Sequence, residues 1–377
     1  MKKKLAVLGA TGSIGKNTVD IIRQNPDDFE PVLFTGNTDR EALLRLGREF
    51  PGVPLALSGG MGKAGVDGIA YYGKAGLLRA VAECGADIAV NGIAGSAGLE
   101  PSLAAIEAGC DVALANKETV VMAGPLVFER AGEKKVNILP VDSEHSAIFH
   151  LINAYGRENV DRVFLTASGG PFRTLSTEDL ALVGVRDALA HPTWKMGAKI
   201  SLDSATLANK GLEVIEACRL FNMEPEDITV LIHPQSIVHS MIRLRNNAVY
   251  AQLSQPDMRL PIQEALYRPE TRPSPFGALD FRGLSLEFAE PDGERFPMLP
   301  LAYEAAKRGG LYPLVYNAAN EIAAETFFRE KIHFLDIARI VRYVMEKDWQ
   351  GSCLNLETIL KTDREARRIA FTLIGDI

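Results

Sequence analysis

The sequence predicts an α/β protein in which a doubly wound, Rossmann-like parallel sheet comes first, an α+β domain follows, and a helical bundle ends the chain. Two patterns predict this order. Residues 1–142 alternate short β-branched runs with longer amphipathic segments, and residues 301–377 keep a helical apolar period. At 377 residues, the chain is long enough for two or three domains that each bury a core.

The first segment, residues 1–142, is expected to form the parallel sheet and its covering helices. Its β-branched runs predict strands at residues 5–8, 32–35, 88–91, 112–115 and 136–141. Its Ala- and Leu-rich runs predict helices at residues 15–25, 41–49 and 99–108. Because strands and helices alternate, the strands should run parallel.

Three further segments follow. Residues 143–267 predict an α+β catalytic domain, with strands at 163–167, 228–232, 237–244 and 249–253, the last two joined by a hairpin at Asn246-Asn247. Residues 268–300 are rich in Pro and Gly, which indicates an extended linker. Residues 301–377 predict a bundle with helices at 301–308, 313–329, 334–346 and 355–373.

Composition and charge narrow the function classes. Lys and Arg number 41 against 48 Asp and Glu, a net charge of −7, which argues against nucleic acid as the main partner and favours a small molecule. The four cysteines form no C-x-x-C pair, so we expect reduced core thiols and no zinc site. The apolar run at residues 5–8 is too short for a signal peptide, and no run is long enough to span a membrane. We therefore expect a cytoplasmic protein.

A glycine-rich segment directly follows the first predicted strand. Residues 9–15 read GATGSIG and open a helix, where backbone N–H groups and the helix N-terminus can meet a pyrophosphate. The alternative is a tight turn without a ligand. The second strand ends at Gly36 and Asn37 without a carboxylate for the ribose, and Arg40 is near enough to meet a 2′-phosphate. This favours NADP over NAD. The alternative is that the strand ends slightly later, which would bring Asp39 into the ribose position that an NAD site requires.

Two carboxylates follow the strand at residues 136–141. Asp142 and Glu144 lie two positions apart, so on an extended segment both would point the same way. Oxygen ligands without cysteine or paired histidine favour Mg²⁺ or Mn²⁺. Capping of a helix that begins near His145 explains the pair equally well.

Neutral donors and one cation gather later in the chain, as a phosphate monoester requires. Ser168 follows a strand in a glycine-rich loop, and Ser204, Asn209 and Lys210 share one short stretch. Glu213 lies one helical turn after Lys210 and could add a third carboxylate to the metal. An ordinary capped helix start is the alternative.

A polar loop at residues 191–197 carries Trp194, which could close over the substrate and exclude water. A Trp packed in the core, with His191 satisfied locally, is the alternative. Outside these segments, His145 and His150 lack the spacing of a zinc-protease motif.

Together these segments resemble the 1-deoxy-D-xylulose 5-phosphate reductoisomerase family over nearly the whole chain. The segments are GATGSIGKNT at 9–18, AAIEAGCDVALANKE at 104–118, VDSEHSAIF at 141–149, ASGGPFR at 167–173, HPTWKMGAKISLDSATLANKGLEVIEA at 191–217, HPQSIVHSMI at 233–242 and PDMRLPIQ at 256–263. The resemblance implies rearrangement of the sugar phosphate to an aldehyde, which NADPH reduces to 2-C-methyl-D-erythritol 4-phosphate. It also implies a divalent cation (Mg²⁺ or Mn²⁺, with Co²⁺ as a further candidate) and a homodimer joined through the second domain's sheet.

The resemblance assigns roles residue by residue. The metal ligands are Asp142, Glu144 and Glu213. The phosphate contacts are Ser168, Ser204, Asn209 and Lys210, and the rest of the substrate meets Ser143, Glu144, Lys117 and His191, with Lys117, Glu144 and His191 as catalytic residues. Trp194 and Met196 belong to the closing loop, and Trp194 contacts the substrate. The cofactor site takes Thr11, Gly12, Ser13, Ile14, Gly36, Asn37, Asn116, Glu118, Met196 and Gly197.

The chain departs from the family after the second strand. The family commonly has G-x-N there, often with a basic x, whereas this chain reads Gly36-Asn37-Thr38, so Arg40 is the substitute candidate for the 2′-phosphate. Two other functions fit parts of the pattern: a non-catalytic NADP-sensing regulator, and another NADP-dependent reductase of a sugar phosphate. The regulator would leave the acidic residues and Lys210 without a purpose.

Overall fold

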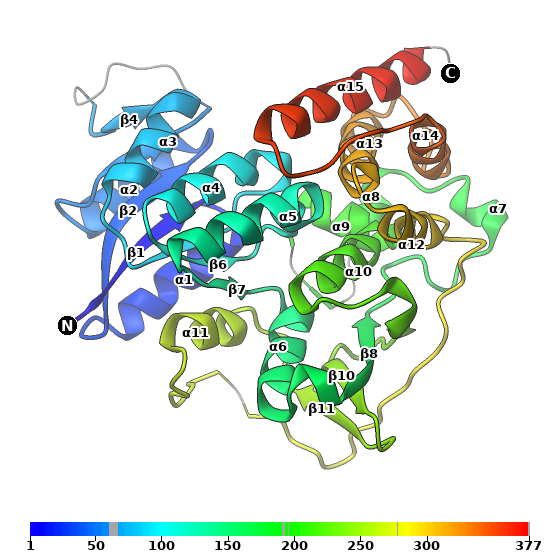
Figure 1. The fold of residues 1–377 in the computed structure, drawn as a ribbon, viewed down its shortest axis with the longest axis horizontal. Coiled ribbons are helices and arrows are strands. Elements are labelled where there is room, and N and C mark those ends of the chain that lie inside the picture. The colour runs from blue at the N-terminus through cyan, green and yellow to red at the C-terminus, as the bar shows by residue number, and fades with distance from the viewer. Residues whose placement is uncertain (60–66, 191–192, 195, 277, 376–377) are drawn as a thin grey trace. The chain divides into compact units, whose positions relative to one another are not determined.

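The computed structural model describes residues 1–59, 67–190, 193–194, 196–276 and 278–375 (Figure 1). Contacts within the chain divide it into two compact units. Unit 1 comprises Met1–Thr119, Val127–Ser146 and Asp257–Phe276, and unit 2 comprises Val120–Leu126, Ala147–Pro256 and Gly277–Ile377.

Unit 1 contains the expected parallel sheet, which confirms the Rossmann-like prediction. Its strands are β1 Lys3–Leu8, β2 Phe29–Gly36, β3 Leu55–Leu57, β4 Tyr71–Tyr72, β5 Ile88–Asn91, β6 Asp111–Leu114 and β7 Ile138–Pro140. Their order is β4-β3-β2-β1-β5-β6-β7, and each neighbouring pair is parallel. From β1 the strand order first runs to one side, through β2 and β3 to β4, and then continues on the other side of β1 with β5, β6 and β7. In such sheets ligands bind at the carboxyl ends of the two strands where the order switches, here β1 and β5.

The helices of unit 1 bury one face each. They are α1 Ser13–Gln24, α2 Arg40–Glu49, α3 Gly73–Glu83, the 3₁₀ turn η1 Gly95–Gly98, α4 Leu99–Glu107 and α11 Arg259–Tyr267. In α1, the buried residues Val19 and Ile22 lie three positions apart, as an amphipathic helix requires.

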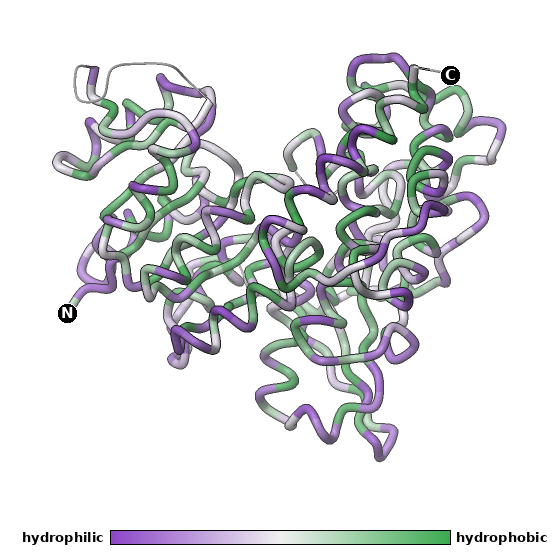
Figure 2. Tube along the Cα trace, turned by 45° about the horizontal axis from the view of Figure 1, so that its top comes forward, coloured by the Kyte–Doolittle hydropathy of each residue, from purple (hydrophilic) through white to green (hydrophobic). Residues whose placement is uncertain are grey.

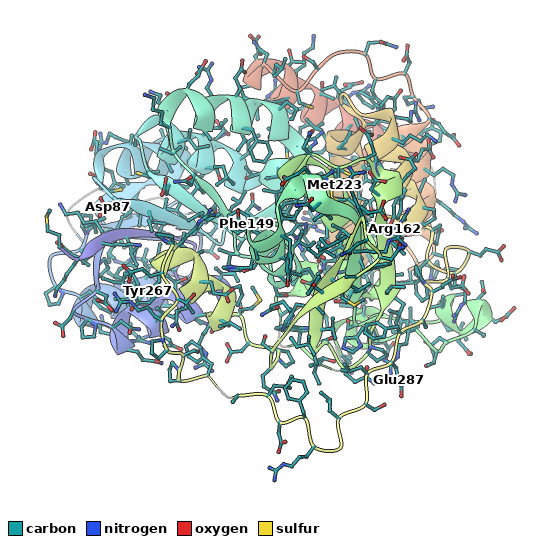
Figure 3. All side chains as sticks on the ribbon, turned by 60° about the horizontal axis from the view of Figure 1, so that its bottom comes forward. Asp87, Phe149, Arg162, Met223, Tyr267 and Glu287 are labelled. Carbon is teal, nitrogen blue, oxygen red and sulfur yellow. The ribbon has the colours of Figure 1, made fainter. Side chains whose placement is uncertain are left out.

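Helix α11 groups with unit 1, although the sequence segment 143–267 placed it with the second domain. Tyr267, labelled in Figure 3, is the last residue of this helix. Its hydroxyl donates to Asp28 at 2.7 Å, and its ring lies 4.9 Å from that of Phe29. These partners lie more than 230 positions earlier in the chain, so a local sequence pattern cannot predict the contact.

Two helices contain boundaries between the units. Helix α5 spans Lys117–Lys134 and is broken at Ala123, whose backbone is not helical. Helix α6 spans Ser143–Tyr155, with its first turn in unit 1 and the rest in unit 2.

Unit 2 contains a second, mixed sheet, as the α+β prediction requires. Its strands are β8 Val160–Ala167, β9 Ile228–Ile232, β10 Val238–Leu244 and β11 Val249–Leu253, in the order β11-β10-β8-β9. Strands β10 and β11 pair antiparallel around Asn247, whose φ is 67°. This pairing confirms the expected hairpin. Asn suits the turn because it tolerates the left-handed conformation that the turn needs.

The helices that lie wholly in unit 2 include two short 3₁₀ turns. They are η2 Arg157–Asn159, α7 Thr177–Leu180, α8 Val185–Leu189, α9 Ala198–Ala205, α10 Ala208–Phe221, η3 Pro225–Asp227, α12 Met298–Arg308, α13 Tyr312–Phe328, α14 Asp336–Met345 and α15 Leu356–Gly375. Figure 2 shows hydrophobic and hydrophilic stretches alternating along the helices near the C-terminus, the pattern of helices that pack on one face. The four C-terminal helices confirm the predicted bundle.

The segment between α11 and α12 is the one for which an extended linker is predicted. Over its described residues it contains neither helix nor strand, only a bridge between Ala289 and Ile232. Among the described helices, none combines the length and apolarity that a membrane crossing needs.

Candidate functional site

The glycine-rich turn after β1 has a backbone that only glycine allows. Gly9 has a φ of 79°, and its backbone lies against Gly92 at the end of β5. A Cβ on Gly15 would lie 2.3 Å from the Gly9 carbonyl oxygen, so the start of α1 packs directly on the turn. This close approach is what a dinucleotide-binding turn requires.

The N-terminus of α1 suits a phosphate group. Among the described residues, no side chain caps this end at Gly12, and its first turn, which includes Ser13 and Ile14, carries no acidic residue. The first amides of a helix point outward and favour an anion. Gly36, at the end of β2, lies next to Thr11, since a Cβ built on it would meet the Thr11 side chain at 3.6 Å.

The expected 2′-phosphate residues surround the start of α2. Asp39 caps this helix, accepting a hydrogen bond from the Ala42 amide at 3.0 Å, so its carboxylate has a structural partner. Arg40 pairs with Asp67 at 2.9 Å, and hydrogen bonds from Tyr72 and then Arg40 lower the pKa of Asp67. Asn37 accepts a hydrogen bond from Ser58 at 3.3 Å. Arg40 is therefore the first residue of α2 and already pairs with a carboxylate.

Asn116 organises the carboxyl end of β6. It caps α5 by accepting from the Thr119 amide, and its own amide group donates to Gly95 at 2.9 Å and to the Glu118 carboxylate at 2.8 Å. Asn116, Lys117 and Glu118 are all buried. The two expected cofactor residues are thus held in one hydrogen-bonded cluster.

Lys117 contacts the first expected metal ligand. Its ammonium group lies 2.5 Å from the Asp142 carboxylate, and both side chains are nearly enclosed. Glu144 accepts from the Ser143 hydroxyl at 2.7 Å. The expected extended geometry of residues 142–144 is wrong, because α6 already begins at Ser143 and Glu144 lies in its first turn.

His145 is a residue to which the sequence alone assigns no functional role. It is fully buried in the first turn of α6, with Nδ1 at 4.0 Å from Asp142. In the sequence, only its position three residues after Asp142 at a helix start connects His145 to the expected site. This spacing is too common to predict a functional residue.

In unit 2, the turn after β8 and the end of α9, which carry two of the expected phosphate contacts, lie against each other. Ser168 begins the turn after β8, where Gly169 and Gly170 both have positive φ. A Cβ on Gly170 would lie 2.6 Å from the backbone oxygen of Ser204, at the end of α9. The glycine therefore lets the segments that carry Ser168 and Ser204 come together.

The first turns of α10 bring three expected residues together. The buried Glu213 carboxylate accepts from Asn209 at 2.5 Å and pairs with the ammonium group of Lys210. The Lys210 and Glu213 side chains are only 4% and 1% exposed. A cation and a carboxylate at positions i and i+3 can each turn toward a ligand of opposite charge.

Helix α9 contains a second cation–carboxylate pair that the sequence did not indicate, with a buried carboxylate and a half-buried lysine. Asp203, next to Ser204, pairs with Lys199 one turn earlier in α9 and accepts from Asn320 of α13 at 2.9 Å. This contact ties the serine-bearing helix to the C-terminal bundle across more than 110 positions.

The expected closing loop is described in part. The half-buried Trp194 has its ring 6.4 Å from that of His239 on β10. Met196 is half-buried, and Gly197 is the N-cap of α9. His191 lies outside the described residues.

Three family models match the chain: 1-deoxy-D-xylulose 5-phosphate reductoisomerase over residues 5–124, its C-terminal domain over 138–221, and the DXP reductoisomerase C-terminal domain over 253–369. The chain belongs to the 1-deoxy-D-xylulose 5-phosphate reductoisomerase family.

Reductoisomerases from several bacteria are similar over their full length. The Treponema denticola protein is 45% identical, covering 100% of this chain and 98% of that one. The Chlorobium chlorochromatii protein is 49% identical over 99% of this chain and 100% of its own. The expected family is thereby confirmed.

Solved reductoisomerase structures have the same fold. The Zymomonas mobilis enzyme in complex with NADPH matches with a TM-score of 0.90 at 41% identity and covers 100% of both chains. A reductoisomerase in complex with NADPH, fosmidomycin and magnesium matches with a TM-score of 0.91 at 41% identity, over 99% of this chain and 98% of the other.

Proposed function

We propose that this chain converts 1-deoxy-D-xylulose 5-phosphate and NADPH to 2-C-methyl-D-erythritol 4-phosphate and NADP⁺, with a divalent cation. The observation that carries the proposal is the full-length identity of 45% and 49% to reductoisomerases. The expected site residues that the structure describes also form buried cation–carboxylate pairs at Lys117–Asp142 and Lys210–Glu213. A non-catalytic NADP sensor would not need either pair.

The glycine turn fits NADPH. The turn at Gly9 and Gly15 leaves no room for a Cβ, and the adjoining N-terminus of α1 suits a pyrophosphate. We assign Thr11, Gly12, Ser13, Ile14, Gly36, Asn37, Arg40, Asn116, Glu118, Met196 and Gly197 to the cofactor. When bound, NADPH supplies the hydride that reduces the aldehyde.

The acidic residues fit a hard divalent cation. Asp142, Glu144 and Glu213 offer carboxylate oxygens, the donors that Mg²⁺ and Mn²⁺ prefer. In the structure they accept contacts that include the Lys117 and Lys210 ammonium groups, the Asn209 amide and the Ser143 hydroxyl. A bound cation would supply the positive charge that the two ammonium groups now supply. When bound, the cation supplies Lewis-acid stabilisation of the substrate oxygens as the C–C bond breaks and reforms.

The chain's own residues bind and orient the sugar phosphate. We assign Ser168, Ser204, Asn209 and Lys210 to the phosphate group, where Lys210 supplies the charge and the others supply neutral donors. Binding the phosphate at one end holds the reacting carbons in one place, which removes much of the entropic part of the barrier.

Lys117 and the closing loop act at the reacting end. The buried ammonium group of Lys117 can hold negative charge that develops on a substrate oxygen, and burial strengthens this interaction. We assign Ser143 and His191 to the substrate hydroxyls and Trp194 to the cover that excludes water.

The proposal extends to assembly, which the resemblance implies, and to location. We propose a homodimer that pairs through β11, an edge strand whose Val249 and Tyr250 are 51% and 37% exposed. Light scattering would test the dimer. We also expect the enzyme in the cytoplasm, since its four cysteines are free thiols.

Product analysis tests the proposed function. The protein is incubated with NADPH, Mg²⁺ and 1-deoxy-D-xylulose 5-phosphate, and the sugar phosphates are followed by NMR. We expect one 2-C-methyl-D-erythritol 4-phosphate for each NADPH oxidised. NADPH binding without turnover would instead favour the sensor, and oxidation with a different sugar phosphate would favour another reductase.

A further inference from the structure

Helix α5 contains a break that leaves backbone groups to be satisfied. Ala123 has φ −141° and ψ 22°, and Pro125 lies inside the helix. Proline has no N–H, so the carbonyl of Val121, four positions earlier, loses its helical donor. Val120 and Val121 are fully buried, and a buried carbonyl needs a hydrogen-bond partner.

Arg219 supplies that partner. Its Nη1 donates to the carbonyls of Val120 and Val121 at 2.6 and 2.7 Å. Burial lowers the pKa of Arg219 from its ordinary value, yet a guanidinium is basic enough to stay charged. Bonds from a charged donor are stronger than those between neutral groups.

Gly124 is shaped to admit this side chain. A Cβ on Gly124 would lie 2.6 Å from Cδ of Arg219. A larger residue would therefore displace the guanidinium from the two carbonyls. The break, the proline, the glycine and the arginine form one device, which we name the α5 clamp (Val120, Val121, Gly124, Pro125 and Arg219).

The clamp acts on the turn that carries Lys117. Lys117 is the first residue of α5, only three positions before Val120, so holding the Val120 and Val121 carbonyls restrains the backbone of the helical turn that begins at Lys117. Arg219 lies on α10, the helix that carries Asn209, Lys210 and Glu213. We infer that Arg219 is a positioning residue that sets the place of the Lys117 ammonium group for the reaction, an inference that rests on the role of Lys117 in the proposed function.

Arg157 provides a matched control. It donates to the carbonyls of Phe221 and Asn222 at 2.8 and 3.0 Å, at the C-terminal end of the same helix, where Arg219 also lies. These carbonyls belong to α10 and its C-cap, whereas the carbonyls that Arg219 satisfies belong to α5. Replacing it should destabilise the protein without moving Lys117.

The test compares R219M, R219K, G124A, R157M and the wild type in the full chain. Kinetic constants, NADPH affinity, Tm and amide hydrogen exchange of the peptide around residues 117–124 are measured. A displacement of about 1 Å can cost roughly a hundredfold in rate, so we expect kcat of R219M to fall by about 10- to 100-fold. The KM for substrate and the Kd for NADPH should change by less than about threefold, because Arg219 is not one of the residues assigned to the substrate or to the cofactor.

The other variants make the result specific. R219K keeps a cationic donor and should recover much of kcat, whereas G124A should reproduce the loss because its Cβ displaces Arg219. In the double variant G124A with R219A, the two effects should not add, since the alanine leaves room for the new Cβ. R157M should lower Tm yet keep kcat within about twofold.

Three results would overturn the inference: an unchanged kcat in both R219M and G124A, an equal fall of kcat in R157M, or a loss confined to KM. If R219M does not fold, R219K and G124A decide. If the wild type itself does not turn over the substrate, the proposed function fails. The clamp is then judged by hydrogen exchange, which should be faster in R219M than in R157M around residues 117–124.

Discussion

Replacing Glu213 by glutamine removes one negative charge from a buried cluster and leaves the size of the side chain almost unchanged. In α10, the Glu213 carboxylate accepts from Asn209 and pairs with Lys210, and it is 1% exposed. Glutamine offers one oxygen and one NH₂ group, so it can still accept one of the two hydrogen bonds. The Lys210 ammonium group would then lie buried without its carboxylate.

The magnitude has two parts. Breaking a buried ion pair by removing one partner costs 3–5 kcal/mol, and we expect about 3 kcal/mol because glutamine keeps one acceptor. For catalysis, Lewis-acid stabilisation is worth several kcal/mol. A loss of about 4 kcal/mol corresponds to roughly a thousandfold in kcat/KM at 1.36 kcal/mol for each factor of ten.

The assay follows NADPH absorbance as Mg²⁺ is titrated, and cofactor binding is measured separately by fluorescence. E213Q should need far more Mg²⁺ and turn over roughly a thousandfold more slowly, with NADPH affinity nearly unchanged. D203N is the matched control, because Asp203 is a buried carboxylate paired with Lys199 and is not an expected ligand. It should lose stability but keep the Mg²⁺ midpoint. A wild-type Mg²⁺ midpoint in E213Q, or a parallel loss of NADPH affinity, would refute this division of roles.

Three further changes test other parts of the site. G15A places a Cβ 2.3 Å from the Gly9 oxygen, so NADPH affinity should fall by at least tenfold, about 1.4 kcal/mol, in a fluorescence titration. G170A combines a φ of 67° with a Cβ 2.6 Å from the Ser204 oxygen, so inhibition by inorganic phosphate should weaken severalfold with little effect on NADPH binding. Burial raises the pKa of every cysteine, for Cys110 to about 11. Since less thiolate forms at neutral pH, alkylation of the native protein should be slower than that of the unfolded chain and should accelerate as the pH rises.

Local patterns were enough to predict the sheet, the hairpin and the bundle. The alternation of short apolar runs and amphipathic segments marks the central strands of unit 1, and Asn246-Asn247 carries the turn between β10 and β11. Strands β3 and β4 are only three and two residues long, too short to show a period. They were missed for that reason.

Features that depend on distant contacts could not be predicted. The bonds from Arg219 to Val120 and Val121 join positions almost a hundred residues apart. The sequence around Arg219 therefore gives no sign that this side chain contacts the break in α5. The mistake at Glu144 has a local cause. The helix of α6 begins at Ser143, directly after Asp142, and an acidic residue at a strand end reads equally well as the last extended residue or as a helix cap.

The most direct test of the central claim uses protein from which metal has been removed by a chelator. NADPH oxidation in the presence of 1-deoxy-D-xylulose 5-phosphate is recorded first in excess chelator and then after addition of Mg²⁺ or Mn²⁺. The proposed function predicts no substrate-dependent oxidation before the cation and full turnover after it. Equal turnover in excess chelator, or no turnover with either cation, would contradict it.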